Sequence, residues 1–251
     1  MDLSTFLTAQ VMGYALVFAR LGSAMIFMPG FGEAMVPVRH RLFAALVLSV
    51  ALYPATPVGL PQVDEPLLLL PLLAIEVTVG LWIGLTARIL MSALQFAGYQ
   101  VGLVSGLANA FAPNMGAFEG ATTIATALLL AATALIFVTD LHHVIIRAFL
   151  MSYDVFAWGN LMPGDLAWQT VEAAGASFYI GISIAAPFYV MGLVLNVGMG
   201  LANRMMPNLP VFFVAAPVLI AAGFVVLIAA APAMLRGFLD PFADWLGTFR
   251  F

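Results

Sequence analysis

Three ionisable side chains in a long apolar stretch have a spacing that could support chemistry. Asp140, His143 and Arg147 are three and four residues apart, so a helix through this stretch would place them on one face, with His142 pointing elsewhere. Ionisable groups at membrane depth usually face a bundle interior or a water-filled path, and they pair with one another. Because an imidazole titrates near neutrality, one hypothesis is a proton relay. We favour the alternative, a buried structural cluster of ion pairs.

The same stretch does not indicate an enzyme or a metal site. A serine nucleophile needs a base and an oriented acid, and the chain contains neither a GxSxG nor an HExxH motif. His142 and His143 would lie on different helix faces, so with Asp140 they could not close a metal site without ligands from elsewhere. Cysteine is absent, which excludes thiolate ligands and a cysteine nucleophile. We therefore predict no catalytic residue, no metal and no cofactor.

A loop from Asn109 to Gly120 combines proline and glycine with bulky apolar side chains. Irregular backbone at membrane depth is tolerated only where it is buried in protein or lines an aqueous cavity, so this loop is suited to obstructing a pore. The alternative is an ordinary interfacial loop that dips into the lipid headgroups. The candidate pore-closing residues are Phe111, Pro113, Asn114, Met115, Gly116, Phe118 and Gly120.

Glycines recur at intervals of four residues in the apolar stretch that precedes this loop. In membranes, small residues at this spacing allow two helix backbones to approach closely. Packing within the chain and packing on a partner subunit both fit the pattern. The candidate packing residues are Gly80, Gly84, Gly98, Gly102 and Gly106.

The composition requires a membrane as the surroundings of these residues. Of 251 residues, 64% are hydrophobic and 8% are charged, whereas a soluble domain carries about 25% charged residues. The net charge of −4 is spread along the chain without a basic run, so nucleic acid is not an expected partner. We predict a single integral membrane domain over residues 1–251.

Six apolar segments follow from the positions of polar and proline-bearing boundaries, and they predict an all-α membrane protein of about six long helices. The third segment, as one helix, would reach about 60 Å, twice the hydrocarbon thickness of a bilayer, so it must break or leave the membrane. The arginines in the connections favour an orientation with both termini outside. The predicted segments are 8–28, 41–57, 66–107, 121–152, 167–203 and 209–235.

Several stretches in order along the chain resemble the FliR family, which comprises the flagellar biosynthetic protein FliR and its type III secretion counterparts. The most specific is the junction that contains Asn203, Arg204 and Pro207, where a polar pair and a proline join two apolar segments. Two positions depart from the family pattern: Ala112 stands where Asp is common, and His142 where Gly is common. The other matching stretches are Arg20-Leu21, Pro29 to Gly32, Val36 to Arg39, Glu76 to Gly84, Gly98 to Gly102, Phe137, Asp140 to His143 and Ser152-Tyr153.

The resemblance implies a structural, channel-forming subunit of a type III protein export gate in the bacterial inner membrane, at the flagellar basal body. Its implied partners are FliP-like and FliQ-like subunits, with FlhB-like and FlhA-like components beside them, and its transient cargo is unfolded secreted proteins. It also implies partly kinked helical hairpins raised out of the bilayer, and a plug role for the loop that ends at Gly120. The alternatives are the equivalent subunit of a virulence secretion system, a polytopic proton-coupled transporter and a membrane scaffold.

Overall fold

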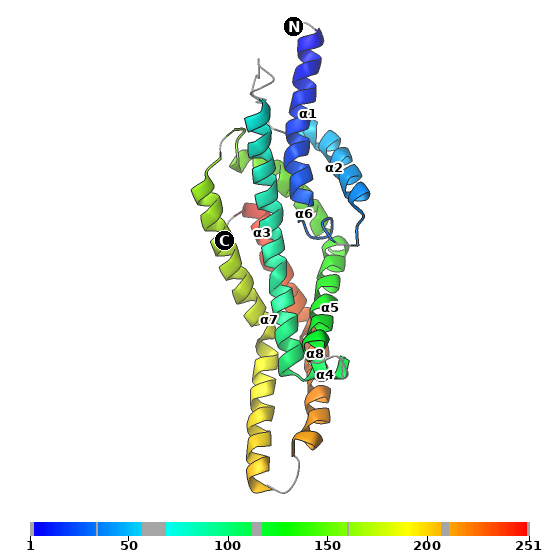
Figure 1. The fold of residues 1–251 in the computed structure, drawn as a ribbon, viewed down its shortest axis with the longest axis vertical. Coiled ribbons are helices and arrows are strands. Elements are labelled where there is room, and N and C mark those ends of the chain that lie inside the picture. The colour runs from blue at the N-terminus through cyan, green and yellow to red at the C-terminus, as the bar shows by residue number, and fades with distance from the viewer. Residues whose placement is uncertain are drawn as a thin grey trace. The chain divides into compact units, whose positions relative to one another are not determined.

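A computed structural model describes residues 3–33, 35–56, 69–111, 117–159, 161–206 and 211–249, and within these ranges every regular element is a helix (Figure 1). The side chains of residues 3–9, 109, 111, 117–120 and 211–214 are not described. The elements are α1 (Leu3–Met25), α2 (Val38–Leu52), the 3-10 turn η1 (Tyr53–Ala55), α3 (Leu69–Val104), α4 (Leu107–Phe111), α5 (Ala117–Val138), α6 (Leu141–Val155), α7 (Pro163–Met205) and α8 (Val211–Thr248).

Five helical stretches of the described chain are long and apolar enough to cross a membrane, which confirms the prediction of an all-α membrane protein. The predicted segment 8–28 is helical as α1 up to Met25, and its described part is not one of the five. The five stretches are Val38–Ala55, Leu69–Val104, Ala121–Val138, Pro163–Met205 and Ala215–Thr248.

Two of the predicted segments differ from the helices in an informative way. Within the segment 66–107, Leu69–Val104 forms a single helix, α3, that runs unbroken for 36 residues, and the chain turns only after it, at Gly106, whose φ is +70°. The segment 121–152 is two helices, because the chain leaves α5 at Val138 and begins α6 at Leu141. Nothing in the apolar pattern marks this second break.

The described chain forms two compact units, and helices α3, α5, α7 and α8 contribute residues to both. The first unit contains residues 1–90, 136–173 and 243–251, and the second contains residues 91–135 and 174–242. That residues 1–251 act as one membrane domain stays a prediction.

In the first unit, α1 lies directly against α3. A Cβ atom on Gly80 would overlap the carbonyl oxygen of Arg20, and one on Gly84 would overlap the carbonyl oxygen of Ala24. Since the residue numbers rise together in both helices, α1 and α3 run parallel. The glycines therefore allow contact at backbone distance, which larger residues would prevent.

In the second unit, α3 and α5 form a hairpin at similarly close range. A Cβ on Gly98 would meet the backbone of Ala125 at under 3.0 Å, and one on Gly102 would meet Ala121 at 2.8 Å. The residue number rises along α3 as it falls along α5, so the two helices are antiparallel. Gly192 of α7 lies against Val104 of α3 in the same unit.

Candidate functional site

Arg20 of α1 is fully buried and forms a bidentate ion pair with Glu76 of α3. Its Nε donates to Oε2 of Glu76 at 2.6 Å, and its Nη2 donates to Oε1 at 3.0 Å. Both side chains are 1% exposed. A fork-to-fork pair of this kind fixes the geometry of both partners, so it determines how α1 and α3 are positioned against each other.

The remaining donors of Arg20 bind the C-terminal end of α6. Nη1 donates to the carbonyl oxygen of Ser152 at 3.0 Å and to its Oγ at 3.2 Å, while Nη2 donates to the carbonyl oxygen of Phe156 at 3.0 Å. A guanidinium has five N–H groups, and these three bonds together with the two to Glu76 use all of them. The ring of Tyr153 lies 4.0 Å from the guanidinium carbon, in cation–π geometry.

A second, partly exposed ion pair joins α3 to the turn that follows α1. Nη1 of Arg88 lies 2.7 Å from Oε1 of Glu33, with side chains that are 37% and 27% exposed. Arg41 donates to the carbonyl oxygens of Glu33 and Val36 in the same turn. We call Arg20 with Glu76, Ser152, Tyr153 and Phe156 the Arg20 cluster. The pair of Arg88 and Glu33 is a second ion pair that involves α3, and it is more exposed.

The sequence reasoning noted Arg20, Glu76 and Ser152 as separate resemblances and did not bring them together. The signal that could have found the pair is that a charge within an apolar segment needs a partner. Arg20 is the one charge within α1, and Glu76 is the one acidic residue within α3, so each was a natural partner of the other.

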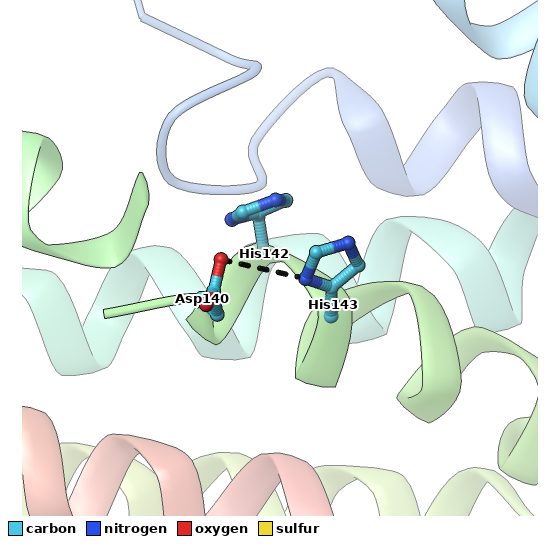
Figure 2. A group of neighbouring side chains, drawn as sticks. All are labelled: Asp140, His142 and His143. Atoms are coloured by element: carbon cyan, nitrogen blue, oxygen red, sulfur yellow. Dashed lines mark ion pairs between the residues drawn. The ribbon is translucent and has the colours of Figure 1, made fainter. Parts of the chain in front are cut away.

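The corner between α5 and α6 places Asp140, His142 and His143 together (Figure 2). Asp140 immediately precedes α6 with left-handed backbone angles, φ 58° and ψ 16°. Its Oδ1 lies 3.7 Å from Nδ1 of His143, and the two imidazole centroids are 4.1 Å apart. One ligand atom from each of the three residues can be chosen so that all lie within 4.8 Å of one another. We call these three residues the corner cluster.

Two expectations for this region are wrong. The side chains of Asp140 and His143 are 77% and 67% exposed in this chain, and Arg147 is also exposed, so they are not a buried stripe. His142 does not point away from the other two residues. The cause is the break after Val138, since Asp140 is not helical and the spacing rule of one continuous helix does not apply to it.

The other predicted site residues lie in different parts of the chain. Pro113, Asn114, Met115 and Gly116 fall outside the described residues, and so does Pro207. For Phe111, Phe118 and Gly120 only the helical backbone is described. Asn203 and Arg204 lie exposed near the end of α7. The plug and junction roles stay predictions.

Helix α7 carries a long exposed face in the second unit. Most of its apolar members are three, four or eight residues apart, so they share one side of the helix. A Cβ atom added to Gly175 or Gly198 would meet nothing within 4 Å. We call the following set the α7 face: Tyr179, Ile182, Val190, Leu193, Val194, Val197, Leu201 and Met205, all of them exposed.

Comparison with known proteins gives consistent matches along the chain. Residues 11–245 match the model of the bacterial export proteins, family 1. The chain is 34% identical to the flagellar biosynthetic protein FliR of Caulobacter vibrioides, over 98% of this chain and 100% of that protein. It is 29% identical to FliR of Bacillus subtilis, over 94% and 93% of the two chains. It is 27% identical to the Yop proteins translocation protein T of Yersinia pestis, over 82% and 80%.

Proposed function

Because the chain belongs to the bacterial export proteins, family 1, we propose that it is a structural, channel-forming subunit of the flagellar type III protein export gate. In this role it shapes and seals a conduit for unfolded proteins and performs no chemical step itself. The flagellar assignment is supported by the 34% identity to the Caulobacter protein over the full length of that relative.

The observation that carries this proposal is the length and exposure of the α7 face. From Tyr179 to Met205 it extends about 39 Å at a helical rise of 1.5 Å per residue, whereas the hydrocarbon core of a bilayer is about 30 Å thick. An average helix tilt of about 20° shortens the projection only slightly. Part of this apolar surface therefore needs protein to cover it, as expected of a subunit in a larger assembly.

We propose that FliP-like and FliQ-like subunits cover this face, with FlhB-like and FlhA-like components beside them, in the bacterial inner membrane at the flagellar basal body. Helix α2 offers a further apolar surface through the exposed Phe43 and Val47. Gly175 and Gly198 of α7 have open space above them, which suits the close approach of another helix.

The plug role of the loop from Asn109 to Gly120 is part of the same proposal. The loop lies between α3 and α5, the two helices that form the close hairpin of the second unit. Gly98 and Gly102 hold that hairpin at backbone distance, which gives the loop a firm base. Its apolar bulk then suits it to closing a narrow pore by excluding water.

A co-purification experiment tests the assembly. The chain carries an epitope tag and is extracted with mild detergent, once with all gate subunits produced and once alone. We expect FliP-like and FliQ-like subunits in the tagged fraction, and we expect aggregation or degradation of the chain produced alone. A monodisperse, protease-resistant monomer that recovers no partner would contradict the proposal. Export of flagellar proteins and the level of the gate complex are then measured in a deletion strain, to separate a conduit from a scaffold. If the chain were only a scaffold, its loss would reduce complex levels and export in proportion.

The second candidate is the equivalent subunit of a virulence secretion system, which the similarity to the Yersinia protein favours. Identifying the proteins whose secretion stops in the deletion strain decides between the two. A proton-coupled transporter is less well supported, because Asp140 and His143 are exposed instead of forming an enclosed proton path.

A further inference from the structure

We propose that Asp140, His142 and His143, the corner cluster, bind one divalent transition-metal ion of the zinc type at the α5–α6 corner. This inference is independent of the export role, and it departs from the sequence-based expectation that the chain holds no metal. It rests on how the corner brings the three side chains together.

The geometry lies within reach of a metal site. Zinc binds imidazole nitrogen and carboxylate oxygen at about 2.0–2.2 Å, which places tetrahedral ligands about 3.3–3.6 Å apart. The three ligand atoms are already within 4.8 Å of one another. Because Asp140 and His143 are exposed, their side chains can turn the remaining distance without disturbing a packed core.

The backbone at Asp140 presents its carboxylate to the imidazoles instead of to the helix. An aspartate immediately before a helix normally accepts hydrogen bonds from the first helical N–H groups, which stabilises the helix. Asp140 makes no such bond and instead adopts positive φ, a conformation that is unfavourable for a residue other than glycine. Its oxygens therefore remain available to a ligand.

A second ligand also has an unused position. Nδ1 of His142 is buried and has no hydrogen-bond partner in the described part of the chain. A buried polar group without a partner destabilises the folded state. A bound metal ion is one way to satisfy the lone pair of an imidazole nitrogen, and His143 stacks beside His142 to supply another.

The donor set selects the class of metal. Two nitrogens and one oxygen suit Zn²⁺, Co²⁺, Ni²⁺ or Cu²⁺, whereas Mg²⁺ and Ca²⁺ prefer oxygen ligands alone. The three residues leave the fourth position of a tetrahedral site open to a further ligand. The chain offers few other ligands for such a metal, since it has no cysteine and its one other histidine is His40. His40 lies exposed at the start of α2.

A metal ion here would fix the corner between two helices. It would join Asp140, which precedes α6, to the first turn of that helix. His142 also stacks with Phe137 of α5 at 5.6 Å, and Phe137 packs on Phe31 at 5.9 Å. The ion would thereby hold the start of α6 in place relative to the turn after α1.

Cobalt titration of the full chain tests the proposal. The chain is purified in its detergent-solubilised complex through a tag without histidine and is stripped of metal with a chelator. We expect one Co²⁺ per chain, with the visible absorption of tetrahedral cobalt, and displacement of that ion by Zn²⁺. Replacing both His142 and His143 with alanine should abolish the absorption.

Two further variants make the test specific. Asn tolerates left-handed angles, so Asp140→Asn keeps the fold while removing a charged ligand, and we expect binding at least about tenfold weaker, since even outer partners of metal ligands contribute 10- to 100-fold. His40→Ala is the matched control and should bind as the wild type does. The proposal is overturned by the absence of saturable binding to the wild type, by binding that persists in the double variant, or by equal losses in His40→Ala and Asp140→Asn.

Discussion

Arg20 shows how a single charge is accommodated in a largely apolar chain. Its five N–H groups all find acceptors, and its plane lies over Tyr153. Arg20→Met would leave the Glu76 carboxylate buried without its partner, which typically destabilises a protein by about 3–5 kcal/mol. We expect markedly lower thermal stability and yield of the purified gate complex. The double variant Arg20→Met/Glu76→Leu should recover part of the loss, because no charge is then stranded.

Arg88→Met is the control for this prediction. Arg88 also pairs with a glutamate, but its side chain is 37% exposed, and exposed pairs contribute about 0–1 kcal/mol. The midpoint of thermal aggregation of the complex compares the two variants. Equal shifts for Arg20→Met and Arg88→Met would show that burial does not set the strength of the Arg20 pair.

Tyr153 gives a prediction in the opposite direction. Its hydroxyl is buried without a hydrogen-bond partner among the described residues, while its ring covers Arg20. Tyr153→Phe keeps the ring and removes the unsatisfied hydroxyl, so we expect unchanged or slightly higher stability, by up to about 1 kcal/mol. Tyr153→Leu removes the ring as well and should be destabilising by about 1 kcal/mol or more.

The pH dependence of Tyr153 follows from its surroundings. Burial raises the pKa of its phenol well above the ordinary value of 10.0. Above pH 10 the unfolded chain therefore loses this proton while the folded chain keeps it. The free energy of unfolding then falls by about 1.4 kcal/mol per pH unit. Melting curves from pH 9 to 11 should show a shallower decline for Tyr153→Phe than for the wild type. A decline in Tyr153→Phe as steep as that of the wild type would refute this account.

The helices divide their glycines between contacts inside the chain and open surface. Gly84 of α3 touches α1, whereas Gly175 of α7 has open space above it. Gly84→Leu should force α1 from α3 and reduce the amount of folded chain in the membrane. Gly175→Leu should leave the chain folded but weaken the binding of a partner helix to α7.

Two measurements on the same membranes distinguish these outcomes. The level of protease-resistant chain reports folding, and the ratio of recovered partner subunits to tagged chain reports assembly. We expect Gly84→Leu to lower the first and Gly175→Leu to lower only the second. If Gly175→Leu recovers partners as the wild type does, this part of α7 lies against lipid and not against a subunit.

Sequence reasoning located the helices well where long apolar runs end at polar or proline residues. It missed the break after Val138, because apolar residues continue on both sides and Asp140, neither glycine nor proline, adopts the left-handed conformation. Because the break was missed, His142 was wrongly expected to point away from Asp140 and His143. The Arg20 cluster could not be read from local patterns either, since its members are 56 and 132 residues apart.

For the chain in its assembly, the pore-closing role of the loop before α5 makes the most diagnostic prediction. Replacing residues 111–120 with a polar linker should make the closed gate leak ions and small solutes while assembly continues. Apolar constrictions exclude water and ions by dewetting, and a polar linker would remove that barrier. Gly116 would let the native loop move aside for cargo, since glycine adopts backbone angles that other residues avoid, whereas Gly120 lies within α5.

Permeability is measured as uptake of a small impermeant reporter in cells that produce the wild-type or the altered gate, with cargo expression switched off. Complex levels are compared by blotting of membranes, and a linker of the same length placed in the connection at residues 57–65 serves as the control. Unchanged uptake at normal complex levels would place the seal in another subunit.

The Arg20 cluster also has a consequence for biosynthesis. The chain is made from its N-terminus, so the ribosome releases Arg20 first, Glu76 next and Ser152 and Phe156 much later. For most of translation the guanidinium has at most the glutamate to bind, and three of its hydrogen bonds wait for α6. A nascent chain that stalls before this point leaves three guanidinium N–H groups without these acceptors in an apolar setting, which is unfavourable. The guanidinium of Arg20 therefore gains its full set of hydrogen-bond acceptors only after the ribosome has released α6 and Phe156.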